Sequence, residues 1–483
     1  MKVTVAVLDK QGKSVVERVL GVLNSFNVRQ PSHFGLVSPK KNLFEKNVEI
    51  LRKQAVASST LAGYITSKPK ASSEYENLQL DDAALLFAGR VYSPAAKTAF
   101  TEQVAKEPFH FEATLQSLME QADGDYMFLI LKDGWIAAAR DPIGVQPLYY
   151  GENKSIVAFS TNRKTLWKLG IENPVSFPPG NLAFADRESF QFKPIKTLTY
   201  TDPTPITMDD ASKTLQILLE RSIQRRVHGL KEFVVAFSGG LDSSLVAFLA
   251  SKCGAKVNLL HVSLENQAET EEAMKAADEL NLPLYVHLFK DSDVERTLPK
   301  VVELIEEPDP IKASIGLPFY WAAEKAVEAG FKVMLAGQGA DELFGGYQRY
   351  VNECSQDGND MARKILFNDV VKIHERNLER DLKICGFHDL ELRLPFASFE
   401  LAEFAIALPI ELKIENKTDT LRKLVLRKVA LNVGMPASIA EKPKKAVQYS
   451  TGINDAIKRI AKKHETSVNE YINEIFLRSK NNA

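Results

Sequence analysis

The sequence predicts a layered α+β domain, then an α/β domain on a parallel sheet, and then a helical C-terminal part. Three observations support this. Short alternating apolar segments separated by Gly, Asp and Pro turns occupy residues 1–186 and favour strands. Between about residues 230 and 340, strand-like runs alternate with helical patterns, which is typical of a parallel sheet with right-handed crossovers. A glycine- and serine-rich loop opens this second part and joins its first strand to its first helix.

In the first part, strand patterns occur at 2–8, 85–91, 126–131 and 135–139, and helical patterns at 14–23 and 113–121. The segment Lys196–Pro205 has little hydrophobic periodicity and reads as a linker between domains at 1–195 and 207–483. Helix signals resume at Thr207, a predicted N-cap followed by acidic residues.

The alternating pattern of the second part predicts a series of elements after the glycine-rich loop. Strands are expected at 257–262, 284–289 and 332–335, and helices at about 269–280, 294–306 and 317–329. In such sheets, ligands bind beyond the carboxyl ends of the strands. The loops after the first and the last of these strands are therefore the places to look for a site.

Composition excludes several classes of function. The 483 residues are enough for two or three domains, and a net charge of −1 gives no reason to expect binding to nucleic acid or a membrane. Three cysteines without a CxxC pair indicate a reducing compartment and argue against a zinc site or a disulfide framework. No run approaches the length of a membrane span, and the first residues do not form a signal sequence. We therefore expect a cytoplasmic protein.

The strongest chemical signal is FVVAFSGGLDSSLVAF at 233–248, which reads as strand, glycine turn and helix N-terminus. Main-chain N–H groups at such a corner, together with serine hydroxyls, bind phosphate. Asp242 would repel phosphate unless Mg²⁺ lies between them. The loop lacks the lysine and spacing of a Walker motif. The alternative interpretation is a turn that only joins the strand to the helix.

A second glycine-rich loop, AGQGADE at 336–342, follows the strand expected at 332–335 and continues as LFGGY. Asp341 is the natural second carboxylate for a metal held by Asp242, because Mg²⁺ prefers a shell of oxygen ligands. Standing alone, this loop would read as a glycine-rich turn with a solvated Asp–Glu pair. Its pairing with the first loop favours a site.

Two motifs in the first part, DGDYMF at 123–128 and RDPIGVQPLYY at 140–150, resemble the class II glutamine amidotransferase domain, which has an Ntn-hydrolase-like layered sandwich fold. In that family an N-terminal cysteine hydrolyses glutamine, whereas this chain has Lys2, whose ammonium cannot replace a thiolate. The run RQPS at 29–32 keeps Arg29 but lacks the usual aspartate, and AGR stands at 88–90 where Asn-Gly is usual. We expect the fold without glutaminase chemistry. Arg29 could equally be an ordinary surface or interdomain arginine.

The SGGLDSS loop looks like the pyrophosphate loop of ATP pyrophosphatases. With the GxGxDExFGGY segment, it resembles the synthetase domain of asparagine synthetases, which has an adenine nucleotide α-hydrolase-like fold. ELRLPF at 391–396 and KPK at 442–444 extend the likeness, which is strong over 230–450 and weak over 1–120. The chain looks closest to archaeal members and to eukaryotic asparagine synthetase domain-containing proteins.

This resemblance implies a reaction. The β-carboxylate of aspartate attacks the α-phosphorus of ATP, giving an acyl-adenylate and pyrophosphate, and ammonia then displaces AMP to form the amide. ATP and Mg²⁺ are the implied cofactors, and ATP, aspartate and ammonia the small-molecule partners. A homodimer and a separate glutaminase that supplies ammonia stay open, and neither nucleic acid nor a membrane is an expected partner.

The resemblance also assigns residues. The catalytic candidates are Lys444, Asp242, Asp341 and Glu391. The cofactor-binding candidates are Ser238, Gly239, Gly240, Asp242 and Ser243 for pyrophosphate, and the main chain near Ala236, Val262 and Gly337 for adenosine. The substrate-binding candidates are Asp341, Glu342 and Arg393, and the metal ligands are Asp242 and Asp341. Lys444 could instead be a solvated lysine of the basic cluster at 442–445, and Lys445 could be the lysine that aligns with the family motif in its place. Arg393 could form a buried structural ion pair.

Two departures concern the acceptor and amine side of the site. Gln338 stands where many asparagine synthetases have Glu and cannot act as a base, and PFAS at 395–398 replaces the usual PFLD. One alternative is a β-lactam-synthetase-like or other carboxylate-adenylating amide synthetase, although Gln338 occupies the position of the tyrosine in the Tyr–Glu pair of β-lactam synthetases. Another is a non-catalytic nucleotide-binding scaffold, which the intact SGGLDSS loop, Asp341 and Lys444 disfavour.

Overall fold

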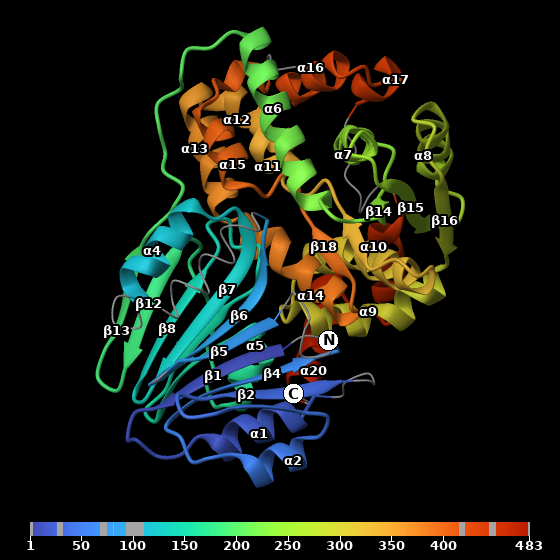
Figure 1. Ribbon diagram of the computed structural model, residues 1–483. Coiled ribbons are helices and arrows are strands. Elements are labelled where there is room, and N and C mark those ends of the chain that lie inside the picture. The colour runs from blue at the N-terminus through green and yellow to red at the C-terminus, as the bar shows by residue number, and fades with distance from the viewer. Residues whose placement is uncertain are drawn as a thin grey trace. The chain divides into compact units, whose positions relative to one another are not determined.

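The structure is a computed structural model that describes residues 3–26, 32–67, 75–80, 82–92, 111–414, 421–443 and 451–481. The chain divides into two compact units, Met1–Thr197 and Leu198–Asn481. Figure 1 shows the strands of the first unit in blue to green and the mainly helical second unit in green to red. Among the described residues, no helix combines the length and the apolar character that crossing a membrane requires.

The strands described in the first unit form two antiparallel sheets. One has the strand order β11 (Val175–Ser176), β9 (Tyr149–Glu152), β10 (Ile156–Ser160), β1 (Val3–Asp9), β4 (Thr60–Thr66), β2 (His33–Val37) and β3 (Asn42–Glu45). The other has the order β13 (Phe190–Pro194), β12 (Asn181–Asp186), β8 (Trp135–Arg140), β7 (Gly124–Lys132), β6 (Ala83–Val91) and β5 (Tyr75–Gln79).

The alternation of side chains along these strands explains why the first unit is layered. On β1, Val5 and Val7 face a core shared with the helices α1 (Val16–Asn24), α2 (Val48–Gln54) and α5 (Arg163–Lys168). Ala6 and Leu8 of the same strand face a second core between the two sheets. The outer face of the other sheet packs on α4 (Phe111–Gln121). The predicted layered sandwich is confirmed.

In the described residues of the second unit, five parallel strands form one sheet. Their order is β16 (Leu284–Phe289), β15 (Lys256–Leu264), β14 (Glu232–Ala236), β17 (Val333–Leu335) and β18 (Glu391–Arg393). From β14 the chain adds β15 and β16 on one side, and from β17 it adds β18 on the other side. The direction in which strands are added therefore reverses between β14 and β17. Open parallel sheets bind ligands beyond the carboxyl ends of their strands at such a reversal. The predicted parallel α/β architecture is confirmed.

Helices make up most of the rest of the second unit. Before and between the strands lie α6 (Met208–Val227), α7 (Leu241–Ser251), α8 (Ala268–Glu279), α9 (Asp291–Ile305), α10 (Pro310–Glu328), α11 (Ala340–Phe344), α12 (Gln348–Gln356), α13 (Asn359–Val371), a π-helical turn (His374–Leu378) and α14 (Glu379–Phe387). After β18 lie α15 (Phe399–Ala407), a 3₁₀ turn (Ile410–Leu412), α16 (Leu424–Asn432), α17 (Ala437–Ala440), α19 (Ile453–Lys463) and α20 (Val468–Asn481), which form the expected helical C-terminal part.

The start of α10 was predicted wrongly. The helix begins at Pro310 and not near Leu317, because Asp309 caps it: its side chain accepts hydrogen bonds from the N–H groups of Ile311 and Lys312 at 2.8 and 3.0 Å. Pro318 lies inside the helix and is buried. A proline in mid-helix obscures the periodic pattern from which a helix start is read.

Candidate active site at the edge of the parallel sheet

The loop after β14 turns directly into the N-terminus of α7. The Ser238 N–H donates to Ser243 Oγ at 3.2 Å, the Gly240 N–H donates to Ser238 Oγ at 3.3 Å, and Ser243 Oγ donates to the Gly240 carbonyl at 3.3 Å. Gly240 is the N-cap of α7 and brings no side chain to cap it. The first N–H groups of the helix therefore point at a place suited to an anion.

The loop after β17 packs tightly against this corner. The strands β14 and β17 pair in register through Val234 with Met334 and Val235 with Leu335, so both loops emerge at the same edge. A Cβ atom on Gly337 would lie 2.9 Å from Cβ of Asp242 and 3.2 Å from the main-chain nitrogen of Ser243. Only glycine allows this approach without displacing α7.

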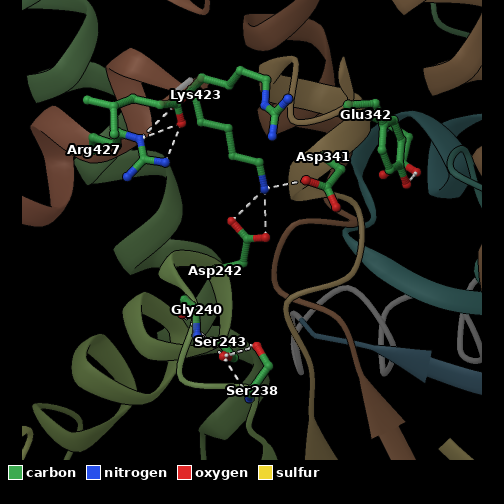
Figure 2. Close-up of polar contacts among 11 residues, drawn as sticks. Ser238, Gly240, Asp242, Ser243, Asp341, Glu342, Lys423 and Arg427 are labelled. Carbon is green, nitrogen blue, oxygen red and sulfur yellow. Dashed lines mark hydrogen bonds and ion pairs between the residues drawn. The ribbon is translucent and has the colours of Figure 1, made fainter. Parts of the chain in front are cut away.

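Lys423 joins the two loops electrostatically. Its Nζ lies 2.7 and 2.6 Å from the two carboxylate oxygens of Asp242 and 2.6 Å from Oδ1 of Asp341, as Figure 2 shows. The Lys423 side chain is 2% exposed, whereas those of Asp242 and Asp341 are 16% and 18% exposed. The structure thus brings the two predicted metal ligands together around one cation.

These two carboxylates fit a Mg²⁺ ion that arrives with a phosphate. Both reach one nitrogen atom, so a single cation can contact both. Within the part of the chain that the structure describes, no group of three or more His, Cys, Asp or Glu side chains could hold a metal by itself. Mg²⁺ is commonly bound by one or two carboxylates, with phosphate oxygens and water completing its shell. The donor set matches that pattern.

Glu342, predicted to bind substrate, is almost fully buried next to Asp341. It accepts hydrogen bonds of 2.6 Å from the Tyr347 hydroxyl and from Asn377 Nδ2, which lies in the π-helical turn. Burial, and then the neighbouring Asp341 charge, raise the pKa of Glu342. Burial, and then the Glu342 charge, raise the pKa of Tyr347. The contacts of Glu342 therefore tie α11 to neighbouring segments, and its role toward substrate stays a prediction.

The remaining predicted acceptor-side residues lie at β18. Arg393 is buried, pairs with Glu391 through Nε and donates to the Arg226 carbonyl through Nη1. The contact matches the ion pair that the sequence left as an alternative for Arg393, and the catalytic role of Glu391 and the substrate-binding role of Arg393 stay predictions. Gln338 donates from Nε2 to Oδ2 of Asp381 at 2.6 Å.

The other predicted positions divide into two sets. Ala236 ends β14, the strand that leads into the first loop, and Val262 lies within the neighbouring strand β15. Lys444 falls outside the described residues. Lys442, two positions earlier, is described: its Nζ lies 2.8 Å from Glu272 Oε2 and 3.5 Å from the Gly239 carbonyl. The basic run therefore contacts the first loop through its first lysine.

Three positions of the first part that bear on glutamine chemistry, Lys2, Arg29 and Gln30, also lie outside the described residues. Gly89 and Arg90 are described and lie on β6, where Gly89 has a left-handed backbone with a φ of 108°. A Cβ atom there would lie 2.1 Å from the Asp125 carbonyl oxygen. Gly89 is therefore needed for the pairing of β6 with β7 at this position.

Lys423 was missed from the sequence. It stands in LRKLVLRKVAL at 421–431, which reads as an ordinary amphipathic helix with surface lysines. The available signal was weak: two basic residues stand next to one another just before the first apolar run of a helix. Only the fold shows that one of them points inward.

A strand–loop–helix corner suited to phosphate, and two aspartates meeting where the strand order reverses, are features that an ATP-dependent synthetase needs. The family model described as "Asparagine synthase" matches residues 214–360 and 352–480, and the model described as "Glutamine amidotransferase domain" matches residues 94–168. The chain belongs to the asparagine synthase family.

Similar proteins carry matching names. The protein named "Putative asparagine synthetase (glutamine-hydrolyzing) 1" of Methanocaldococcus jannaschii is 33% identical over 404 residues, which are 73% of this chain and 74% of that protein. The asparagine synthetase (glutamine-hydrolyzing) of Asparagus officinalis is 28% identical over 379 residues, covering 74% of this chain and 62% of that protein. Among solved structures, one titled as the allosteric regulatory enzyme of purine biosynthesis matches with a TM-score of 0.34 at 12% identity, over 59% of this chain and 80% of that chain.

Proposed function

We propose that this protein makes asparagine from aspartate and ammonia, converting ATP to AMP and pyrophosphate. One observation carries the proposal: Asp242 and Asp341 meet around one cation beside a helix N-terminus suited to phosphate. This reaction needs a site that binds the triphosphate and leaves its α-phosphorus accessible to the attacking carboxylate. The reversal of strand order between β14 and β17 supplies a place for it.

The proposed roles follow from these positions. The loop at 238–243 holds the leaving pyrophosphate through main-chain N–H groups and serine hydroxyls. Asp242 and Asp341 hold Mg²⁺, which neutralises phosphate charge when bound. The main chain near Ala236, Val262 and Gly337 contacts the adenosine. Lys444 supplies a cation to the charged transition states, a role that rests on the KPK match alone.

We further propose that residues 1–195 form an amidotransferase-like domain that has lost glutaminase chemistry and that residues 207–483 form the synthetase domain. Residues 1–195 contain no cysteine, so no thiolate is available there to attack glutamine, which supports this. The relatives above are named glutamine-hydrolyzing, so this chain departs from them at the step that generates ammonia. Ammonia then comes from solution or from a separate glutaminase.

The test is a set of assays on the purified protein with ATP, Mg²⁺ and aspartate, in parallel with ammonium, with ammonium-free glutamine and without a nitrogen donor. Asparagine, AMP and pyrophosphate are each measured. We expect equal amounts of all three products with ammonium and no glutamate from glutamine.

Three results would contradict the proposal. Release of glutamate from glutamine would show that the first domain is an active glutaminase. Absence of pyrophosphate under every condition would favour a nucleotide-binding scaffold, and pyrophosphate that appears only with another carboxylate would identify a different acceptor.

A further inference from the structure

Lys423 occupies the place between Asp242 and Asp341 that a metal ion would need. Its ammonium contacts three carboxylate oxygens within 2.7 Å and is shielded from water, since the side chain is 2% exposed. A cation in this position compensates two carboxylates that would otherwise repel each other. It also fills the volume and takes the lone pairs that a divalent ion would use.

The backbone is built to hold Lys423 there. Arg422 and Lys423 both adopt left-handed conformations, with φ values of 48° and 55°, which are strained for residues other than glycine. Arg427 holds the turn: its Nε donates to the carbonyls of Leu421 and Arg422 at 2.8 and 2.7 Å, and its Nη1 donates to the Ala440 carbonyl at 2.5 Å. The buried Arg427 side chain therefore holds the strained turn in place through these hydrogen bonds.

Gly346 completes this arrangement on the other side. A Cβ atom there would lie 1.9 Å from Asp341 Oδ1 and 2.3 Å from Lys423 Cε. The aliphatic part of the Lys423 side chain thus passes close to Gly346, whose lack of a side chain lets the ammonium group reach the carboxylates. Three separate features (the left-handed turn, the Arg427 bonds and Gly346) serve the position of a single ammonium group.

We propose that Lys423 is a resident counter-ion that keeps free divalent metal out of the site, so that metal enters only together with the triphosphate. A free divalent ion would have to displace a buried ammonium and leave it without an anion. A metal–triphosphate complex brings its own negative charge, to which the ammonium can turn when it leaves the carboxylates. This inference rests on the proposed metal role of Asp242 and Asp341.

The test measures Mn²⁺ binding by electron paramagnetic resonance in the absence of nucleotide. It compares the wild-type protein, Lys423→Met and the control Lys428→Met, whose lysine lies on α16 and is half-exposed. We expect Lys423→Met to bind free Mn²⁺ at least about tenfold more tightly than the wild type, because the competing cation is gone. Lys428→Met should bind free Mn²⁺ as the wild type does. Equal affinity in Lys423→Met and the wild type would overturn the proposal.

Two further measurements keep the result decisive. Mn²⁺ alone should raise the melting temperature of Lys423→Met and not that of the wild type, which shows that the variant is folded and that its site is loaded. In the wild type, a non-hydrolysable α,β-methylene analogue of ATP should convert weak Mn²⁺ binding into tight binding. Tight binding of free Mn²⁺ by the wild type would refute the counter-ion role alone. No Mn²⁺ binding even with the analogue would refute the metal role of the two aspartates and the proposal with it.

Discussion

Gln338 and Asp381, 43 positions apart in the sequence, are joined by a hydrogen bond of 2.6 Å from Nε2 to Oδ2. Asp381 is fully buried, and the adjacent Arg380 donates to both of its oxygens, at 2.7 and 3.0 Å. Burial raises the pKa of Asp381, although the Arg380 charge opposes this. The amide at position 338 therefore satisfies a buried carboxylate that a glutamate there would repel.

The first prediction concerns Gln338→Glu. It places a second carboxylate against Asp381, and we expect a loss of about 1–3 kcal/mol in the free energy of unfolding at pH 8. In the folded variant the two neighbouring carboxyl groups would share a proton, whereas in the unfolded chain both have released theirs. The folded state therefore binds more protons than the unfolded state, and the loss of unfolding free energy should shrink as the pH falls toward 5. Urea denaturation at several pH values measures this. Gln338→Met is the control: it removes the hydrogen bond that lowers the pKa of Asp381 but adds no second carboxyl group, so its loss should vary less with pH. An equal dependence on pH in the two variants would refute the prediction.

The second prediction concerns Gly337→Ala. The added methyl group would press on Asp242 Cβ and the Ser243 nitrogen, so we expect the two loops to separate and turnover to fall by at least about tenfold, while overpacking costs about 1–3 kcal/mol of stability. Gly386→Ala is the matched control: a Cβ atom there meets nothing within 4 Å, and alanine favours the helix α14. Comparable activity in the two variants would show that the close approach at residue 337 has no bearing on the site.

The third prediction concerns Asp242→Asn, which removes one proposed metal ligand but keeps the shape of the side chain. We expect kcat for pyrophosphate release to fall by roughly 100-fold or more, with a far-ultraviolet circular dichroism spectrum like that of the wild type. Asp278→Asn, an exposed position on α8, should retain full activity. Unchanged pyrophosphate release in Asp242→Asn would remove the metal assignment.

The fourth prediction concerns Lys413, which is buried and donates from Nζ to the Ala405 carbonyl at 2.5 Å. Burial, and then the Arg363 charge, lower the pKa of Lys413 to about 7, well below the value of about 10.4 expected in the unfolded chain. Between these values the unfolded chain binds more protons than the folded protein, so this group makes stability rise with pH.

Replacing Lys413 by Met should therefore flatten the dependence of stability on pH between 7 and 9.5. The difference in slope should reach at most ~1.4 kcal/mol per pH unit. Chemical denaturation across this range measures it, with the half-exposed Lys428→Met as a control that keeps the wild-type slope. Parallel curves for Lys413→Met and the wild type would show that Lys413 titrates normally in the folded protein.

Much of the second unit could be predicted because its strands are parallel and bounded by clear loops. Asp242 and Asp341 each follow a strand closely, and the carboxyl ends of parallel strands share one edge, so their proximity could be anticipated from local patterns. The layers of the first unit could be predicted for a similar reason. Alternation on β1 assigns Val5 and Val7 to one face and Ala6 and Leu8 to the other.

The contacts that complete the site could not be predicted in this way. Lys423 lies 181 positions from Asp242 in the sequence, and its inward direction depends on a left-handed turn that no periodic pattern announces. The partner of Gln338 comes from α14, and its choice depends on how that helix packs. Lys413 reads as a surface lysine because nothing next to it in the sequence indicates burial.

In the proposed reaction, a substrate carboxylate attacks the α-phosphorus of a triphosphate held by the loop at 238–243 and by Asp242 and Asp341. Aspartate labelled with oxygen-18 in its β-carboxylate tests this directly, by mass spectrometry of the nucleotide and pyrophosphate after turnover with ammonium. We expect one labelled oxygen in AMP and none in pyrophosphate. Label in pyrophosphate or inorganic phosphate, or asparagine formed with unlabelled AMP, would contradict it.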